Sequence, residues 1–248
     1  MKRTLIAIAA AALMPATLAS AAPFETNPME GDREMHSYIL LDRTGSMSGI
    51  WDEALTSVNA YAKTVSEERD GEAPDTLKTE ITLAVFDHQG GLQYDLLRRN
   101  ANADAWQAVT SNEASPRGMT PLFDAIGRTI SMAEEDNPER AVIVIMTDGH
   151  ENASQEFTRE TARAALDRAK EKGWEVIFLG ADFGQFSDAE GVGVAQSKVM
   201  GMSSGTMQES MQRLATKARD YGTGEEAEVN FNDEDRAIAR EEDVKDRN

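Results

Sequence analysis

Oxygen-bearing side chains stand at alternate positions just after a short apolar run near the start of the chain. Residues 38–48 read Tyr-Ile-Leu-Leu-Asp-Arg-Thr-Gly-Ser-Met-Ser, so Asp42, Thr44 and Ser46 follow the run together. A carboxylate and hydroxyls, without imidazole or thiol, suit Mg²⁺, Mn²⁺ or Ca²⁺ better than zinc or copper. The same pattern fits a turn that merely caps the following helix, so the motif alone leaves both interpretations open.

Two further oxygen-bearing side chains stand at predicted element boundaries later in the chain. Thr120 precedes a predicted helix in which Pro121 suits the first turn, which places Thr120 at the N-cap position. Asp148 closes an apolar run that begins at Ala141. An N-cap role is a sufficient explanation for Thr120 taken by itself.

Short apolar runs predict the strands that carry these residues. Four to six apolar residues are too few for a helix and typical of a strand buried on both faces. Strands are predicted at 38–41, 80–86, 92–97, 141–146, 175–179 and 198–202. The loop between 86 and 92 contains Gly90 and Gly91 and is too short for a parallel crossover, so the third strand is predicted to be an antiparallel edge.

Segments with apolar residues every three to four positions predict the helices. These helices are predicted at 48–69, from 122 onward, at 157–172 and at 207–221, with a short helix at 104–109. Alternating strands and helices predict an α/β fold, a doubly wound, Rossmann-like three-layer sandwich with a mostly parallel sheet. Such folds bind ligands beyond the carboxyl ends of the strands, where all five oxygen-bearing side chains are expected to meet.

The first segment predicts export. Residues 1–21 combine Lys2 and Arg3, an apolar stretch and a terminal Ala-Ser-Ala, which is the pattern of a cleaved signal peptide and too short for a membrane span. Cleavage would take the formal charge from −19 to −21 by removing those two cations. The chain has no cysteine, so it forms no disulfide. We expect a periplasmic or secreted protein without a membrane span.

Charge and composition set further limits. A chain this acidic is a poor candidate to bind nucleic acids or anionic membranes, because their phosphates attract Lys and Arg side chains. Residues 22–34 are polar and are predicted to be a disordered leader. Residues 223–248 hold ten acidic and four basic residues and few large apolar ones, which predicts a solvated, largely disordered tail outside the core.

The three motifs together resemble the von Willebrand factor type A family over about residues 35–222. Its metal-ion-dependent adhesion site uses Asp-x-Ser-x-Ser, a distant Thr and a distant Asp. The matching positions here are Asp42, Thr44, Ser46, Thr120 and Asp148, with Thr44 in place of the first Ser. The resemblance implies a six-stranded sheet with one antiparallel edge strand and a role in binding rather than catalysis. It also implies Mg²⁺, or Mn²⁺ or Ca²⁺, as the ion and a protein partner that presents Asp or Glu to it.

The sequence also suggests two other classes of function. Residues 201–205 read Gly-Met-Ser-Ser-Gly, which fits the nucleophile elbow of a hydrolase with Ser203 as nucleophile. The catalytic His of that fold follows the nucleophile, whereas His36, His88 and His150 all precede Ser203. A subunit of a larger metal-dependent assembly is the second alternative, and the predicted signal peptide argues against a cytoplasmic one.

Overall fold

The computed structural model describes residues 33–68, 77–182 and 186–245. The predicted signal peptide, most of the predicted leader and the last three residues lie outside this part of the chain. No helix within the described residues is long and apolar enough to cross a membrane.

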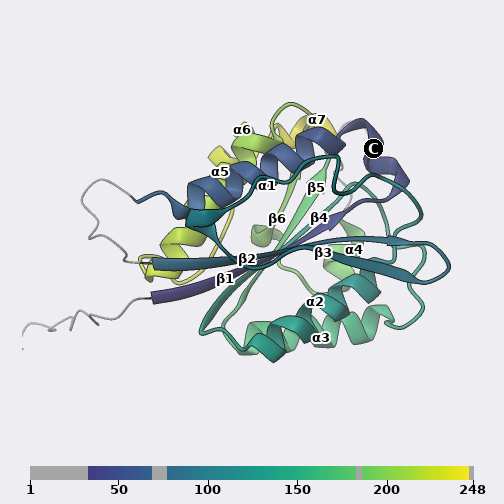
Figure 1. The fold of residues 1–248 in the computed structure, drawn as a ribbon, viewed down its shortest axis with the longest axis horizontal. Helices are drawn as coiled ribbons and strands as arrows, with labels where there is room; N and C mark the ends of the chain where they lie inside the picture. Colours follow the sequence, from purple (N-terminus) through teal and green to yellow (C-terminus); the bar gives the residue numbers. More distant parts are fainter. Residues whose placement is uncertain (1–32, 69–76, 183–185, 246–248) are drawn as a thin grey trace, which may run out of the picture. The chain divides into compact units, whose positions relative to one another are not determined.

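The core of the fold is a six-stranded sheet (Figure 1), in the order β3-β2-β1-β4-β5-β6. Its strands are β1 Arg33–Asp42, β2 Leu77–His88, β3 Leu92–Asn102, β4 Arg140–Thr147, β5 Glu175–Ala181 and β6 Val199–Met202. All neighbours pair in parallel except β3, which runs antiparallel to β2 at one edge. The predicted fold class and the antiparallel edge strand are confirmed.

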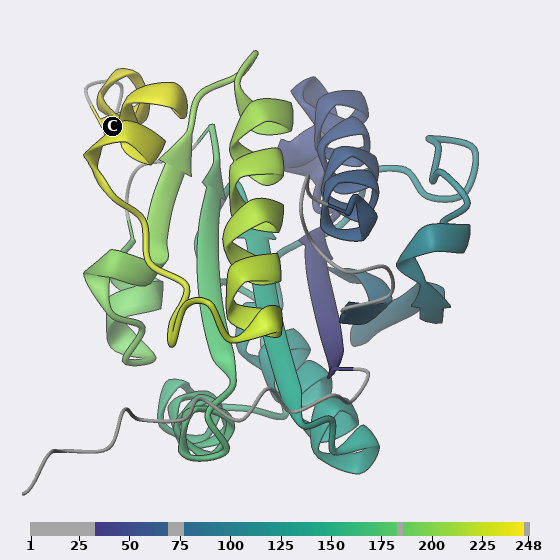
Figure 2. The same cartoon turned by 90° about the vertical axis from the view of Figure 1, so that its left-hand side faces the viewer.

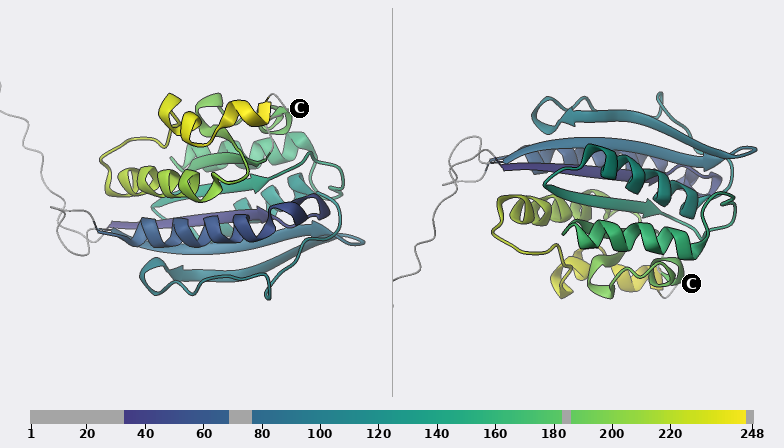
Figure 3. Two further views of the ribbon diagram at one scale, coloured as in Figure 1. Left: turned by 90° about the horizontal axis from the view of Figure 1, so that it is seen from above. Right: turned by 90° about the horizontal axis from the view of Figure 1, so that it is seen from below.

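Helices cover both faces of this sheet. Helices α1 Trp51–Ser66 and α5 Met207–Thr223 lie on one face, and α2 Leu122–Asp136 and α3 Arg159–Glu171 lie on the other (Figures 1 and 3). Alternate side chains of β1 point to the two helix layers on either face of the sheet. Ile39 and Leu41 pack with α1 and α5, whereas Tyr38 and Leu40 pack with α2 and α3. This explains why the central strands are apolar without interruption.

The register of the central strands brings the predicted ligands to one edge. Leu41 pairs with Met146 between β1 and β4, so Asp42 and Thr147 end side by side and Asp148 follows one residue later. Asp42 also pairs with Phe86 at the end of β2. The carboxyl ends of β1, β2 and β4 therefore form one rim of the sheet.

Local differences from the predicted elements are small outside the tail. The helix predicted at 104–109 is only a 3₁₀ turn at Ala103–Ala105, where Asn102 Oδ1 accepts the Asp104 N–H at 2.9 Å. A short helix, α4 Ser187–Gly191, was not predicted. The predicted helices at 48–69 and 157–172 are each shorter in the structure.

The predicted disorder of the acidic tail is wrong for residues 224–245. Helices α6 Asp233–Ile238 and α7 Glu241–Lys245 lie beside β6 (Figure 2). The buried apolar tail residues are Val229, Phe231, Ala239 and Val244. Glu241, only 2% exposed, accepts the Gly201 N–H of β6 at 3.1 Å and pairs with Arg236 and Lys245. Average composition did not predict this packing, because the few large apolar residues include three that are buried, Val229, Phe231 and Val244, and the buried carboxylate of Glu241 is paired with Arg236 and Lys245.

Candidate metal centre

Asp42 is the innermost side chain of the candidate site. It is fully buried at the end of β1, where both carboxylate oxygens accept hydrogen bonds. The Thr44 N–H donates to Oδ1 at 2.7 Å, and the Thr147 hydroxyl donates to Oδ2 at 2.6 Å. The carboxylate is therefore held in one orientation by the turn after β1 and by the last residue of β4.

The remaining candidate ligands form a continuous hydrogen-bonded chain beside Asp42. The Ser46 hydroxyl donates to Asp148 Oδ1 at 2.7 Å and lies 3.1 Å from the Thr44 hydroxyl oxygen. The Thr120 hydroxyl donates to Thr44 Oγ1 at 3.4 Å. Three segments far apart in the sequence thus bring all five oxygen-bearing side chains named in the sequence analysis into one cluster.

The backbone around Gly118 sets the position of Thr120. Arg117 donates its N–H to Arg43 O at 2.8 Å, and Gly45 donates to Gly118 O at 3.2 Å. Gly118 has φ +72, and a Cβ there would lie 2.5 Å from His88 O. Only glycine combines this left-handed backbone with so close an approach. The segment before Thr120 is therefore fixed between the ends of β1 and β2.

Thr120 is not the N-cap of α2, contrary to the prediction. Pro121 occupies that position without a side-chain cap, and Glu151 Oε2 accepts the Phe123 N–H of the first turn at 3.0 Å. Asn152 holds the Thr120 backbone from both sides, accepting its N–H at 2.8 Å and donating to its carbonyl at 3.0 Å. The Thr120 hydroxyl is thereby left to face the cluster.

Asp124 fixes the loop after Asp148, a role that the sequence did not reveal. Its carboxylate accepts three backbone N–H groups, from Gln155 at 2.8 Å, Glu156 at 2.9 Å and Phe157 at 2.6 Å. An acid in the first turn of a helix is too common a feature to signal this function. Together with Glu151 and Asn152, it attaches the loop that carries Asp148 to the helix that follows Thr120.

The electrostatics of the cluster favour a bound cation. Burial raises the pKa of Asp42 to about 7 and also raises the pKa of Asp148. Neither carboxylate has an ion-pair partner among the described residues. Arg43 adjoins Asp42 in sequence, but its guanidinium pairs with Asp87 at 2.7 Å and Asp95 at 2.6 Å.

The donor types fit a hard divalent cation. The carboxylates of Asp42 and Asp148 would neutralise the charge of such an ion. The three hydroxyl groups of the cluster would complete a ligand set made only of oxygen atoms. In the described part of the chain, no group of three or more His, Cys, Asp or Glu side chains could hold a metal ion. Any metal binding at this cluster therefore depends on its hydroxyls, which argues against zinc or copper.

Two further serines stand outside the five-residue set. Ser48 donates to Gly45 O at 2.7 Å within a 3₁₀ turn, whereas Ile50 holds the N-cap position of α1. Ser203 is 5% exposed at the end of β6. The histidines bond elsewhere, with contacts from His36 to Thr82, His88 to Gln155 and His150 to Asp188. None of these contacts involves Ser203.

Sequence and structure comparisons agree with this fold. The family model of the von Willebrand factor type A domain matches residues 38–238. A search of curated proteins finds no match.

Several solved structures share the architecture at low sequence identity. The pilus adhesin SpaC of Lactobacillus rhamnosus GG is 13% identical with a TM-score of 0.57, over 76% of this chain and 30% of that one. The vWF domain of the type V pili tip protein Mfa5 from Porphyromonas gingivalis is 10% identical with a TM-score of 0.54. The match covers 75% of this chain and 95% of the Mfa5 domain.

A mussel structure has the same fold. Proximal thread matrix protein 1 from the mussel byssus is 12% identical with a TM-score of 0.52, over 75% of this chain and 46% of its own. The chain thus spans less than half the length of SpaC and of the mussel protein. At these identities the likeness concerns the fold alone.

Proposed function

The chain belongs to the von Willebrand factor type A domain family, and from this premise we propose that it is an exported adhesion module that binds a protein partner through a divalent cation. The observation that carries the proposal is the cluster of Asp42, Thr44, Ser46, Thr120 and Asp148. It combines five oxygen donors from three segments with two carboxylates that have no ion-pair partner among the described residues.

We assign the five side chains as the residues that would hold Mg²⁺, or Mn²⁺ or Ca²⁺. When bound, the ion would supply an open coordination position for an acidic side chain of the partner. Asp42 would contribute a charge that Thr44 N–H and the Thr147 hydroxyl already orient. Ser46 and Thr44 would turn their hydroxyl lone pairs from each other toward the ion, at the cost of the bonds they now share.

The charge of the site favours a carboxylate on the partner. Two acidic ligands balance a divalent cation, and the other three donors are neutral, so one added carboxylate builds little excess negative charge. The formal charge of −19 on the whole chain opposes an acidic partner only weakly, because the Debye length is about 8 Å at physiological salt. We therefore expect a partner with one acidic residue in a neutral or basic surround.

Adhesion outside the cytoplasm fits two further observations. The sequence of residues 1–21 has the pattern that predicts a signal peptide, and two proteins of the same fold are described as a pilus adhesin and a pili tip protein. A non-enzymatic role is in keeping with the buried Ser203 and the separate contacts of the three histidines. Periplasmic and secreted locations both satisfy the proposal.

Calorimetric titration with MgCl₂ and MnCl₂ tests the proposal directly. The full-length protein should bind one ion, and Asp42→Asn and Asp148→Asn should each abolish the heat of binding. Asp104→Asn is the matched control, because Asp104 is exposed in the turn Ala103–Ala105 and lies on a different segment. Equal ion affinity in all four proteins would show that the cluster is not a metal site.

A further inference from the structure

Asp87 is a fully buried acid beside the candidate metal centre that is not one of the five proposed ligands. It is the next-to-last residue of β2. Its Oδ1 accepts a hydrogen bond from Arg43 Nε at 2.7 Å, and its Oδ2 accepts one from Arg117 Nε at 3.2 Å. Hydrogen bonds between charged groups are among the strongest in proteins. Each oxygen of Asp87 is therefore bound to a different arginine.

The two arginines belong to the two loops that carry hydroxyl ligands of the proposed site. Arg43 stands between Asp42 and Thr44 in the sequence, and its side chain is 4% exposed. Arg117 belongs to the loop that leads to Thr120, and its side chain is 42% exposed. Through these two side chains, one carboxylate of β2 is bonded to the loop after β1 and to the loop before α2.

The backbones of the two loops meet at the same place. The Gly45 N–H of the first loop donates to Gly118 O of the second at 3.2 Å. A Cβ on Gly118 would lie 2.9 Å from Asp87 Oδ2, so the carboxylate also lies close to the backbone of the second loop. Asp87 thus lies where the loops contact each other.

The charges around Asp87 balance. Arg43 also donates to Asp95 at 2.6 Å, and Arg117 lies 4.0 Å from the same carboxylate. Two arginines and two aspartates form a network without net formal charge. Because both oxygens of Asp87 are bound to arginines, we assign its contribution to the site to geometry rather than to negative charge.

We propose that Asp87 is a positioning residue that holds the loop after β1 against the loop before α2. It thereby sets the distance between the hydroxyl oxygens of Thr44 and Thr120, which are 3.4 Å apart and belong to one loop each. The effect on ion binding rests on the proposed function, whereas the effect on the loops can be measured without an ion.

Amide hydrogen exchange of the full-length protein in EDTA tests the positioning directly. Asp87→Asn keeps the size of the side chain but removes its charge. We expect the Gly45 N–H, which joins the two loops, to exchange about tenfold faster or more. The Trp174 N–H, which donates to Ala169 O at 3.1 Å elsewhere in the fold, should keep its rate. Equal acceleration at both amides, or at neither, would overturn the proposal.

Arg117→Met is a second variant that leaves the buried pair of Arg43 and Asp87 intact. It removes a positive charge, so electrostatics alone predicts tighter Mg²⁺ binding. Loss of a hydrogen bond that positions the loop predicts binding about fivefold weaker in calorimetry. It also predicts faster exchange of the Gly45 N–H. Tighter or unchanged Mg²⁺ binding would overturn the link between Asp87 and the site.

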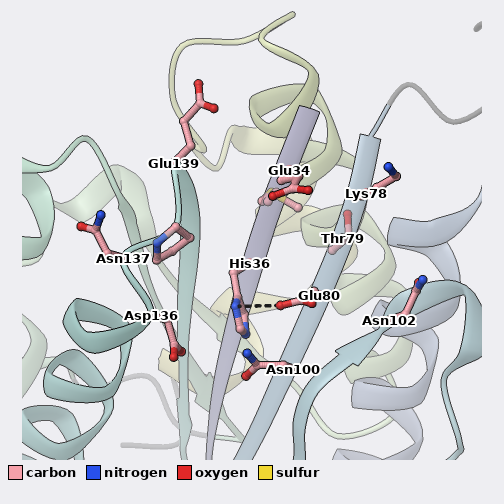
Figure 4. Close-up of a pocket in the computed structure, with 12 residues that line it drawn as sticks. Glu34, His36, Lys78, Thr79, Glu80, Asn100, Asn102, Asp136, Asn137 and Glu139 are labelled. Atoms are coloured by element: carbon pink, nitrogen blue, oxygen red, sulfur yellow. Dashed lines mark ion pairs between the residues drawn. The ribbon is translucent and has the colours of Figure 1, made fainter. Parts of the chain in front are cut away.

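Two further substitutions match the loss of charge in Asp87→Asn. Asp95→Asn removes a negative charge from the same network, but the Asp95 side chain is 55% exposed. Glu80→Gln removes one from the other end of β2, where Glu80 lines a polar cavity (Figure 4). Both should keep Mg²⁺ affinity within about twofold, because exposed charges contribute little.

Asp87→Asn should weaken Mg²⁺ binding about tenfold, as expected when charged hydrogen bonds that hold the loops are lost. Equal affinity in Asp87→Asn and Asp95→Asn would overturn the proposal. A wild-type protein that binds no Mg²⁺ would contradict the proposed function instead, and the exchange rates of Gly45 and Trp174 would still decide whether Asp87 positions the loops.

Discussion

The Thr147 hydroxyl donates a 2.6 Å hydrogen bond to Asp42 Oδ2 and so joins the ends of β4 and β1. The two residues are fully buried, and Thr147 directly precedes Asp148 in the chain. Because the β1–β4 register places the two strand ends side by side, this single bond orients one of the two proposed acidic ligands and joins it to the backbone that leads to the other. Thr147 itself has no role as an ion ligand in our proposal.

Replacing Thr147 by Val should therefore weaken ion binding without removing any proposed ligand. Asp42 would lose one of its two hydrogen bonds in a buried position, which costs about 1 to 3 kcal/mol of unfolding free energy. We expect Mg²⁺ affinity to fall at least about fivefold by calorimetry. Thr147→Ser keeps the hydroxyl and should stay close to wild type. If Val and Ser variants bind Mg²⁺ equally, the bond does not position Asp42.

Gly118 offers a test of how the position of Thr120 controls the site. Gly118→Ala forces a Cβ to within 2.5 Å of His88 O, so the backbone before Thr120 must move. We expect Mg²⁺ affinity to fall about tenfold or more. Gly90→Ala is the matched control, since Gly90 has the same φ of +72 with no atom within 4 Å of its Cβ.

The comparison of these two glycine variants separates backbone strain from steric contact. Gly90→Ala should cost only the left-handed strain of a non-glycine residue, about 1 to 2 kcal/mol, and leave Mg²⁺ affinity unchanged. A Gly118→Ala protein that binds Mg²⁺ as tightly as Gly90→Ala would show that the segment before Thr120 is not critical.

The acidic tail should contribute strongly to stability, in contrast to the expectation from composition. A chain that ends at Gly224 loses the buried side chains of Val229, Phe231 and Val244 and the carboxylate that accepts the Gly201 N–H. Each large apolar side chain contributes about 1.5 to 3 kcal/mol, so the melting temperature should fall by about 10 °C or more in calorimetry. A chain that ends at Lys245 is the control, and a melting temperature shared by the two truncations would show that the tail packing contributes nothing.

Stability should also depend on His36 in mildly acid solution. Its neighbours are Tyr38 on β1, Glu80 and Thr82 on β2, Arg99 on β3 and Asp136 on α2. Burial lowers its folded-state pKa from 6.5 to about 4, so between these values the unfolded chain binds a proton that the folded chain does not. The free energy of unfolding should therefore fall as pH is lowered through this window, by up to about 3 kcal/mol.

Denaturant titrations of wild type and His36→Phe between pH 7 and pH 4 measure this effect. The variant lacks the titrating group, so its free energy of unfolding should decline less over the same range. Parallel curves for the two proteins would mean that the pKa of His36 is the same in the folded and unfolded states.

Much of the fold could be predicted from the sequence because the patterns that indicate strands, helices and turns lie within short stretches of the chain. Unbroken apolar runs such as Ala141–Met146 are typical of strands buried on both faces, and the short loop that contains Gly90 and Gly91 favours an antiparallel return. The five oxygen-bearing side chains also stand in local motifs at strand or helix ends. Family membership followed from these motifs and is confirmed by the match over residues 38–238.

Only the tertiary structure decided the contacts that hold these motifs together. Asp124 and Gln155 are 31 residues apart, and Glu241 and Gly201 are 40 apart, so no periodic pattern records that they meet. Pro121 rather than Thr120 holds the N-cap position of α2, and Asn152 and Glu151 from another loop bond the Thr120 backbone and the first turn of the helix. Whether a polar group is satisfied, and hence what it is free to bind, depends on neighbours brought close by packing, and the Thr120 hydroxyl beside Thr44 is an example.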